Sequence, residues 1–162
     1  MAINEFASWL ETRRFAVTIA QSDWLFPSLE AVHVMAIGLV VGSIAMLDLR
    51  LLGFSRKDSG VVELAAETLP WTWLSFSIAV LTGALMFASA ATRYVALLPF
   101  LIKMLLLLAA GINMVAFHLG AYRHVARWNN QLPSPRAARI AGALSLSFWV
   151  TVVFCGRWIG FV

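Results

Sequence analysis

Residues 26–53 read FPSLEAVHVMAIGLVVGSIAMLDLRLLG, and this stretch decides the fold class. Most of it is valine, isoleucine, leucine, alanine, methionine or glycine, and a helix that spans a bilayer needs about 20 such residues. The whole chain of 162 residues is 61% hydrophobic and only 12% charged. A soluble domain usually has about a quarter of its residues charged. We therefore predict an integral membrane protein.

Four stretches are long and apolar enough to span a membrane, at about residues 28–49, 70–91, 99–122 and 138–161. Pro70 and Pro99 are expected to open the second and third. Residues 3–20 carry large apolar side chains at helical spacing, which predicts an amphipathic helix on the membrane surface or, alternatively, one that caps the bundle mouth. The expected fold is an all-α membrane protein, a four-helix transmembrane bundle with an N-terminal amphipathic interfacial helix, in one membrane domain over residues 1–162.

The loops differ in charge. The connections after the first and third spans carry seven basic residues, which are Arg50, Arg56, Lys57, Arg123, Arg127, Arg136 and Arg139. The opposite side has four, which are Arg13, Arg14, Arg93 and Arg157. Because basic loops stay in the cytoplasm, we expect a bacterial inner-membrane protein with both termini in the periplasm. The net charge of +4 then reflects this asymmetry and not a nucleic-acid partner.

Three ionisable residues define an outer polar layer. Lys103 lies about 6 Å past Pro99 by helical rise, and His33 lies about 9 Å past Pro27, with Glu30 slightly shallower. Ionisable side chains within a span are costly and usually face the bundle interior. We therefore expect Glu30, His33 and Lys103 to meet in the outer half of the bundle. The alternative is that Lys103 extends outward to the membrane interface.

A second, inner layer contains Asp48, Arg50, Asn113 and His118. We expect Asp48 and Arg50 to pair near the end of the first span, in a cluster that serves packing or function. His118 lies about 28 Å along its span, some 20 Å deeper than His33. Since an axial nitrogen lies about 2 Å from a metal, we do not expect one haem to bridge both histidines. Gly38 and Gly42 have the spacing that allows close helix packing.

A family resemblance rests on three segments, WLFPSLEAVHVMAIGLVVGSIAMLDLRLLG, LPW and PFLIKMLLLLAAGINMVAFH. Together they resemble an uncharacterised family of four-helix bacterial membrane proteins, a domain of unknown function. More distantly, the chain is similar to HemJ-type protoporphyrinogen oxidases and copper-resistance D membrane domains, whose pattern is matched by His33, Gly42, Lys103 and His118. This resemblance implies a b-type haem with His33 on the metal and Lys103 in the same site. The first span ends in LDLRLLG instead of the histidine-rich end of HemJ, so porphyrin oxidation is not carried over.

The leading hypothesis is a haem-b-binding membrane redox protein, a possible oxidoreductase, with the cofactor in the outer half of the bundle. His33 would bind the iron, Lys103 would pair with a propionate or approach the sixth position, and Glu30 would orient the imidazole. The partner would be a quinone or a periplasmic redox protein.

Two alternatives stay open. The ionisable residues could line a proton or metal-ion (copper) pathway or channel in a homo-oligomer, since carboxylate–histidine chains relay protons in transporters. The chain could instead be a structural membrane subunit whose polar layers only join helices.

Overall fold

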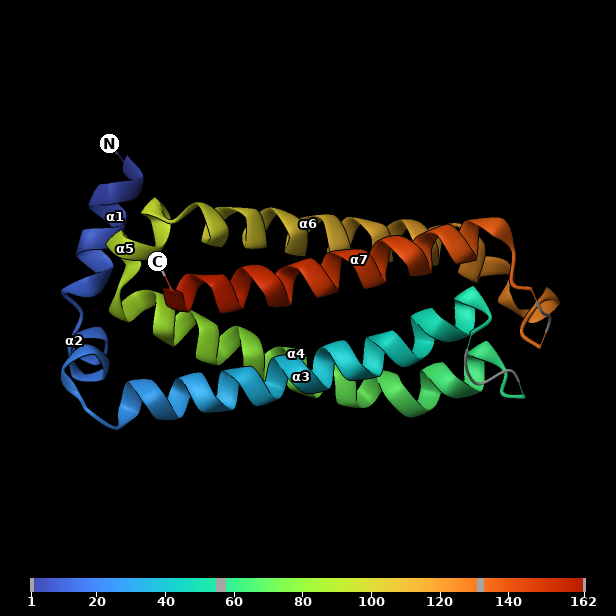
Figure 1. Ribbon diagram of the computed structural model, residues 1–162, viewed down its shortest axis with the longest axis horizontal. Helices are drawn as coiled ribbons and strands as arrows, with labels where there is room; N and C mark the ends of the chain where they lie inside the picture. The colour runs from blue at the N-terminus through green and yellow to red at the C-terminus, as the bar shows by residue number, and fades with distance from the viewer. Residues whose placement is uncertain (1, 55–57, 131–132, 162) are drawn as a thin grey trace.

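The computed structural model describes residues 2–54, 58–130 and 133–161, which are helical with no strand among them. Four helices are long and apolar enough to cross a membrane, which confirms the four predicted candidate spans. They lie side by side along the long axis of the molecule (Figure 1). They are α3 (Leu25–Leu52), α4 (Val61–Ser89), α6 (Leu98–Leu119) and α7 (Arg136–Trp158), the last followed by the short 3-10 turn η2 (Ile159–Phe161).

The second span differs from its predicted start. Helix α4 begins at Val61, and Pro70 lies inside it, so the prediction that Pro70 opens the span is wrong. A proline removes one backbone hydrogen bond, here to the Ala66 carbonyl, and membrane helices tolerate this loss. Helix α6 begins as predicted, with Pro99 in its first turn.

The N-terminal segment forms two helices instead of one, α1 (Ala2–Glu11) and α2 (Arg14–Gln21). Helix α1 packs against the short α5 (Ala91–Ala96), and α2 packs against α4. The Glu11 carboxylate accepts hydrogen bonds of 2.8 Å from both the backbone N–H and the hydroxyl of Thr92. We call this end of the bundle, where both termini also lie, the terminal end, and the opposite end the loop end (Figure 1).

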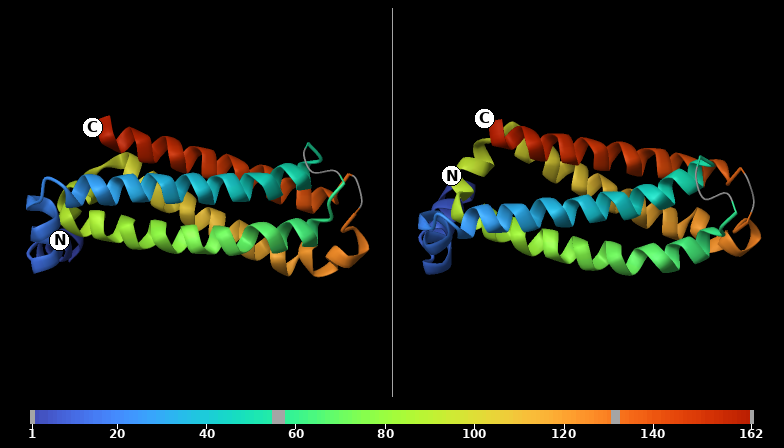
Figure 2. Two further views of the ribbon diagram at one scale, coloured as in Figure 1. Left: turned by 90° about the horizontal axis from the view of Figure 1, so that it is seen from below. Right: turned by 60° about the horizontal axis from the view of Figure 1, so that its bottom comes forward.

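The four long helices do not close a complete ring. Helix α3 packs against α4 and α7, and α7 packs against α6, whereas α4 and α6 make few direct contacts among the described residues. The order around the bundle is therefore α4, α3, α7, α6. The α4–α6 side is crossed near the terminal end by the stacked rings of Phe87 and Phe100, 5.5 Å apart, and is otherwise the open side of the bundle. Figure 2 shows the helices from two further directions.

Small and hydroxylated side chains form the seam between α3 and α4. The seam residues on α4 recur at helical spacing and are buried, namely Thr68, Thr72, Ser75, Ala79 and Thr82. The Thr72 hydroxyl donates to the Ser43 hydroxyl across the seam at 2.7 Å. Gly38 and Gly42 do not take part, because a Cβ at either would meet no atom within 4 Å. The prediction that these two glycines pack helices together is wrong for the described part of the chain.

At the loop end, Arg50 is completely buried. Its Nε donates to the Ser59 carbonyl at 2.7 Å, and its Nη2 donates to the Asn129 carbonyl at 3.2 Å, just after the 3-10 helix η1 (Ala121–Arg127). The predicted Asp48–Arg50 pair is wrong, since Asp48 Oδ2 and Arg50 Nη1 both lack a hydrogen-bond partner. Helix residues two positions apart do not face each other, so the two side chains point to different neighbours.

Candidate functional site

The terminal half of the bundle brings His33 and Lys103 together from different helices. His33 lies on α3 and Lys103 on α6, and both are half-buried. The Lys103 Nζ lies against α7, 3.7 Å from where a Cβ on Gly156 would be. Its positive charge acts on the His33 imidazole. The two residues therefore share one electrostatic environment inside the bundle.

The His33 ring is oriented by Thr82. Nδ1 lies 3.0 Å from the Thr82 Oγ1, whose own proton is donated to the Ile78 carbonyl at 2.7 Å. A hydroxyl has only one proton to give, so Nδ1 is the donor in the His33–Thr82 bond whenever the Thr82 proton goes to Ile78. In the neutral imidazole this leaves Nε2 unprotonated, with its lone pair available.

Gly83 provides the space for this ring. A Cβ at Gly83 would lie 3.0 Å from His33 Cε1, closer than an ordinary van der Waals contact. Sequence reasoning missed both Thr82 and Gly83 as site residues. The helical recurrence of hydroxyl residues at positions 68, 72, 75 and 82 was the signal that could have identified Thr82.

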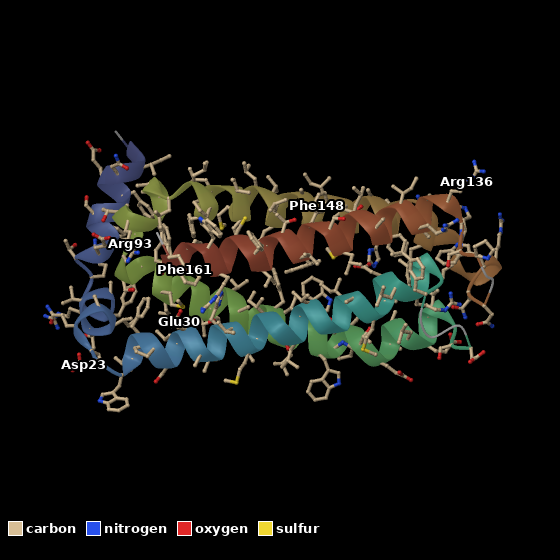
Figure 3. All side chains as sticks on the ribbon, viewed as in Figure 1. Asp23, Glu30, Arg93, Arg136, Phe148 and Phe161 are labelled. Atoms are coloured by element: carbon tan, nitrogen blue, oxygen red, sulfur yellow. The ribbon has the colours of Figure 1, made fainter. Side chains whose placement is uncertain are left out.

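Glu30 is not the residue that holds the His33 Nδ1. It is exposed at the terminal end of α3 (Figure 3), and the atom that holds His33 Nδ1 is the Thr82 oxygen. The Glu30 carboxylate instead acts on Tyr94 of α5. Burial raises the pKa of the Tyr94 hydroxyl, the neighbouring Arg93 lowers it, and Glu30 raises it.

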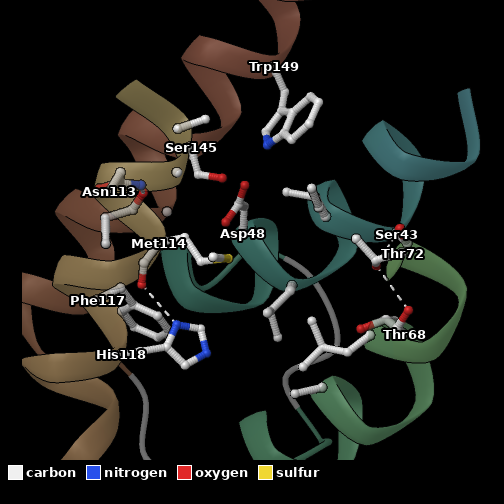
Figure 4. Close-up of a pocket in the computed structure, with 18 of the residues that line it drawn as sticks. Ser43, Asp48, Thr68, Thr72, Asn113, Met114, Phe117, His118, Ser145 and Trp149 are labelled. Carbon is white, nitrogen blue, oxygen red and sulfur yellow. Dashed lines mark hydrogen bonds between the residues drawn. The ribbon is translucent and has the colours of Figure 1, made fainter. Parts of the chain in front are cut away.

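A cavity of about 610 Å³ lies between the four long helices toward the loop end (Figure 4). This volume is within the range of small-molecule sites, about 300–1,000 Å³. Its wall is mainly aliphatic and aromatic. Of the predicted inner cluster, Asp48, Asn113 and His118 line the cavity, and Arg50 does not.

Asp48 is the acidic residue of this wall, and one of its two carboxylate oxygens lacks a hydrogen-bond partner. Its side chain is only 4% exposed, and Oδ2 has no hydrogen-bond partner. The Ser145 hydroxyl from α7 interacts with the carboxylate. In Figure 4 the carboxylate points toward Ser145 and away from the α3 backbone.

Two further polar residues of the wall, His118 and Asn113, each donate a hydrogen bond to a backbone carbonyl. His118 Nδ1 donates to the Met114 carbonyl at 2.8 Å, because a carbonyl can only accept. Asn113 Nδ2 donates to the Ala141 carbonyl at 2.9 Å. The neutral His118 Nε2 and the Asn113 Oδ1 are therefore acceptors. Ser145 and Trp149, four residues apart on α7, complete the wall, and sequence reasoning missed them both.

Comparison with known proteins places the chain in a family. Residues 6–162 match a family model described as a family of unknown function, DUF6644. The chain belongs to the DUF6644 family. No curated protein and no solved structure matches it. The expected relation to an uncharacterised family is thus supported, and the expected similarity to HemJ and copper-resistance D proteins receives no support.

The two polar regions of this DUF6644 protein are separate. His33 lies about 12 Å from the start of α3, and His118 lies about 30 Å from the start of α6, by helical rise. Neither His33 nor Lys103 lines the loop-end cavity. Among the described residues, no group of three or more histidine, cysteine, aspartate or glutamate side chains could hold a metal ion. A metal at either region would need a ligand set that includes other atoms.

Proposed function

We propose that this DUF6644 protein is a haem-b-binding membrane redox protein, with the cofactor in the terminal half of the bundle on His33. The observation that carries the proposal is the His33–Thr82 hydrogen bond, which leaves Nε2 as the free nitrogen. Histidines that bind metals usually donate their other ring N–H to a fixed acceptor, as His33 does.

The neighbouring donor set suits a haem. Lys103 supplies an amine that can pair with a propionate carboxylate or approach the iron. When bound, the haem would supply one-electron chemistry. The residues of the chain would hold and orient the cofactor and exclude water from it. A quinone or a periplasmic redox protein would be the electron partner.

The charge distribution supports a bacterial inner-membrane location with both termini in the periplasm. Arg123 and Arg127 of η1 and Arg136 and Arg139 of α7 all lie at the loop end, which would be cytoplasmic. Arg56 and Lys57, counted on the same side, lie outside the described residues. Helix α1 would then lie at the periplasmic surface, with the exposed Phe6 and Trp9 in the membrane interface.

A reduced-minus-oxidised visible spectrum of the purified protein, expressed with haem supplied, tests the proposal. We expect a sharp reduced band that is lost in His33→Ala and kept in the matched control His118→Ala. Absence of a band in the wild type would overturn the proposal. Equal loss in both variants would contradict the separation of the two regions.

A second candidate is a proton pathway. The observation that favours it is the buried stripe of Thr82, Ser75, Thr72 and Thr68, which runs along α4 from His33 toward Asp48. In liposomes with an internal pH dye, His33→Ala and Asp48→Asn should then each abolish proton flux. A wild type with neither a haem band nor flux of protons or copper would leave a structural subunit.

A further inference from the structure

We propose that the loop-end cavity binds an apolar molecule that carries a protonated amine, with Asp48 as its counter-charge. This inference does not depend on haem binding, because His33 and Lys103 do not line the cavity. It rests on three properties of the cavity, which are its access, its incompletely hydrogen-bonded carboxylate, and the absence of lysine and arginine from the described residues that line it.

Access comes from the open side of the bundle. Leu69 and Trp73 of α4 line the cavity on one side of the gap, and Val115 and Leu119 of α6 line it on the other. Helices α4 and α6 make few direct contacts among the described residues, so little protein separates the cavity from the surroundings there. Trp73 is 50% exposed and Leu119 is 66% exposed. A ligand with an apolar body would therefore enter sideways, from the hydrocarbon of the bilayer.

Asp48 has no counter-charge among the described residues that line the cavity. Burying a carboxylate without a counter-charge is costly, and buried charges are normally paired. Arg50 is directed toward the Ser59 and Asn129 carbonyls, and no lysine or arginine is among the described residues that line the cavity. Asp48 Oδ2 is buried and unpartnered. A cationic ligand would supply both the missing charge and the missing donor.

The chemistry of the wall favours an ammonium group over a hydroxyl. Asp48 Oδ2 lacks a hydrogen-bond partner, and two other residues that line the cavity, Asn113 and His118, each carry an atom that can accept a hydrogen bond. An ammonium has three donors and no acceptor, so its hydrogen-bonding capacity is the complement of this set. A hydroxyl, as in an alcohol or a quinol, has one donor and two acceptor sites of its own.

Photolabelling of the protein in lipid nanodiscs tests the proposal, with a diazirine-bearing decylamine as the probe and mass spectrometry to locate the label. We expect label on α6 and α7 peptides that contain Met114 or Trp149. Unlabelled decylamine should compete, and decanol of equal chain length should compete about tenfold or more weakly, since a hydrogen bond to a charged group is lost.

Two cavity variants and one control variant keep the test specific. Asp48→Asn should lower labelling about tenfold, whereas Asp58→Asn, an exposed aspartate at the same end, should leave it unchanged. Gly111→Leu should block labelling by filling the cavity, and it should fold because a Cβ at Gly111 meets no atom within 4 Å.

Three results would overturn the proposal. The first is that decanol competes as well as decylamine. The second is that Asp48→Asn and Gly111→Leu are both labelled as strongly as the wild type. The third is that the label is confined to contacts between two copies of the chain. The haem spectrum is read separately, so failure of one proposal is distinguishable from failure of the other.

Discussion

The Thr82 Oγ1 lies 3.0 Å from His33 Nδ1 and 2.7 Å from the Ile78 carbonyl one turn earlier in α4, so it accepts from the imidazole while it donates to the carbonyl. The geometry of one helix thus decides which imidazole nitrogen on a neighbouring helix remains free. The distinction matters because only an unprotonated nitrogen can bind a metal or accept a proton.

Replacing Thr82 by valine tests this relationship. Valine keeps the shape of the side chain and removes the acceptor, so we expect haem affinity to fall about 10–100-fold, as for other partners of metal-binding histidines. Titration with haem, followed by absorbance, gives the affinity. Thr82→Ser should restore binding, since it retains the hydroxyl, and the exposed Ser77→Ala on the same helix should have no effect. Wild-type affinity in Thr82→Val would show that the hydroxyl does not orient the ring.

Two glycines should respond in opposite ways to the same substitution. In Gly83→Ala the new Cβ would lie 3.0 Å from His33 Cε1, so the ring must shift and stability should fall by about 1–3 kcal/mol. In Gly38→Ala the new Cβ meets no atom within 4 Å, and the better helix propensity should raise stability by about 0.5–1 kcal/mol. Unfolding in mixed micelles, followed by circular dichroism, measures both. Equal effects of the two changes would contradict the close α3–α4 approach at Gly83.

Arg50→Ala should destabilise the protein by at least about 2 kcal/mol. The change removes the guanidinium donors of the partly buried Ser59 and Asn129 carbonyls and a side chain with no exposed surface, although the Val61 N–H still donates to the Asn129 carbonyl. The same unfolding assay measures the loss, with the exposed Arg139→Ala at the same end as control. If both arginine variants unfold like the wild type, Arg50 does not hold the loops together.

The contact between Glu11 and Thr92 should protect the break between α1 and α2 from trypsin. Glu11→Ala removes both 2.8 Å hydrogen bonds to Thr92 and frees α1 from α5. Cleavage after the exposed Arg13 should then become about fivefold faster, which corresponds to about 1 kcal/mol of local stability. The time course of digestion on gels gives the rate, and Glu5→Ala, also on α1, should match the wild type. No change in Glu11→Ala would mean that α1 is held by its apolar contacts alone.

Hydropathy was sufficient to locate the four long helices, because an apolar run as long as residues 26–53 is typical of a transmembrane helix. It could not place the start of α4. Residues 61–69 belong to α4 but are less apolar than the rest of the helix, so hydropathy does not include them. Pro70 lies inside the helix and marks no boundary in the structure.

The sites were less accessible to sequence reasoning. Because rise per residue is fixed, depth along the helices could place His33 and Lys103 at similar heights, and the charge of Lys103 does act on the His33 imidazole. The partner of His33 depended on how α3 and α4 face each other, and a single helix does not contain that information. The same holds for Asp48, whose actual neighbour Ser145 lies on α7 and whose expected partner Arg50 points elsewhere.

The Arg50 contacts also impose an order on how the protein is made. The Ser59 carbonyl is nine residues from Arg50 and is available as soon as α3 and its loop leave the ribosome. The Asn129 carbonyl is 79 residues away and does not exist until α6 has been synthesised. The α3–α4 hairpin therefore enters the membrane with a guanidinium that still lacks its second acceptor. The loop end is therefore complete only after translation of the third long helix and η1.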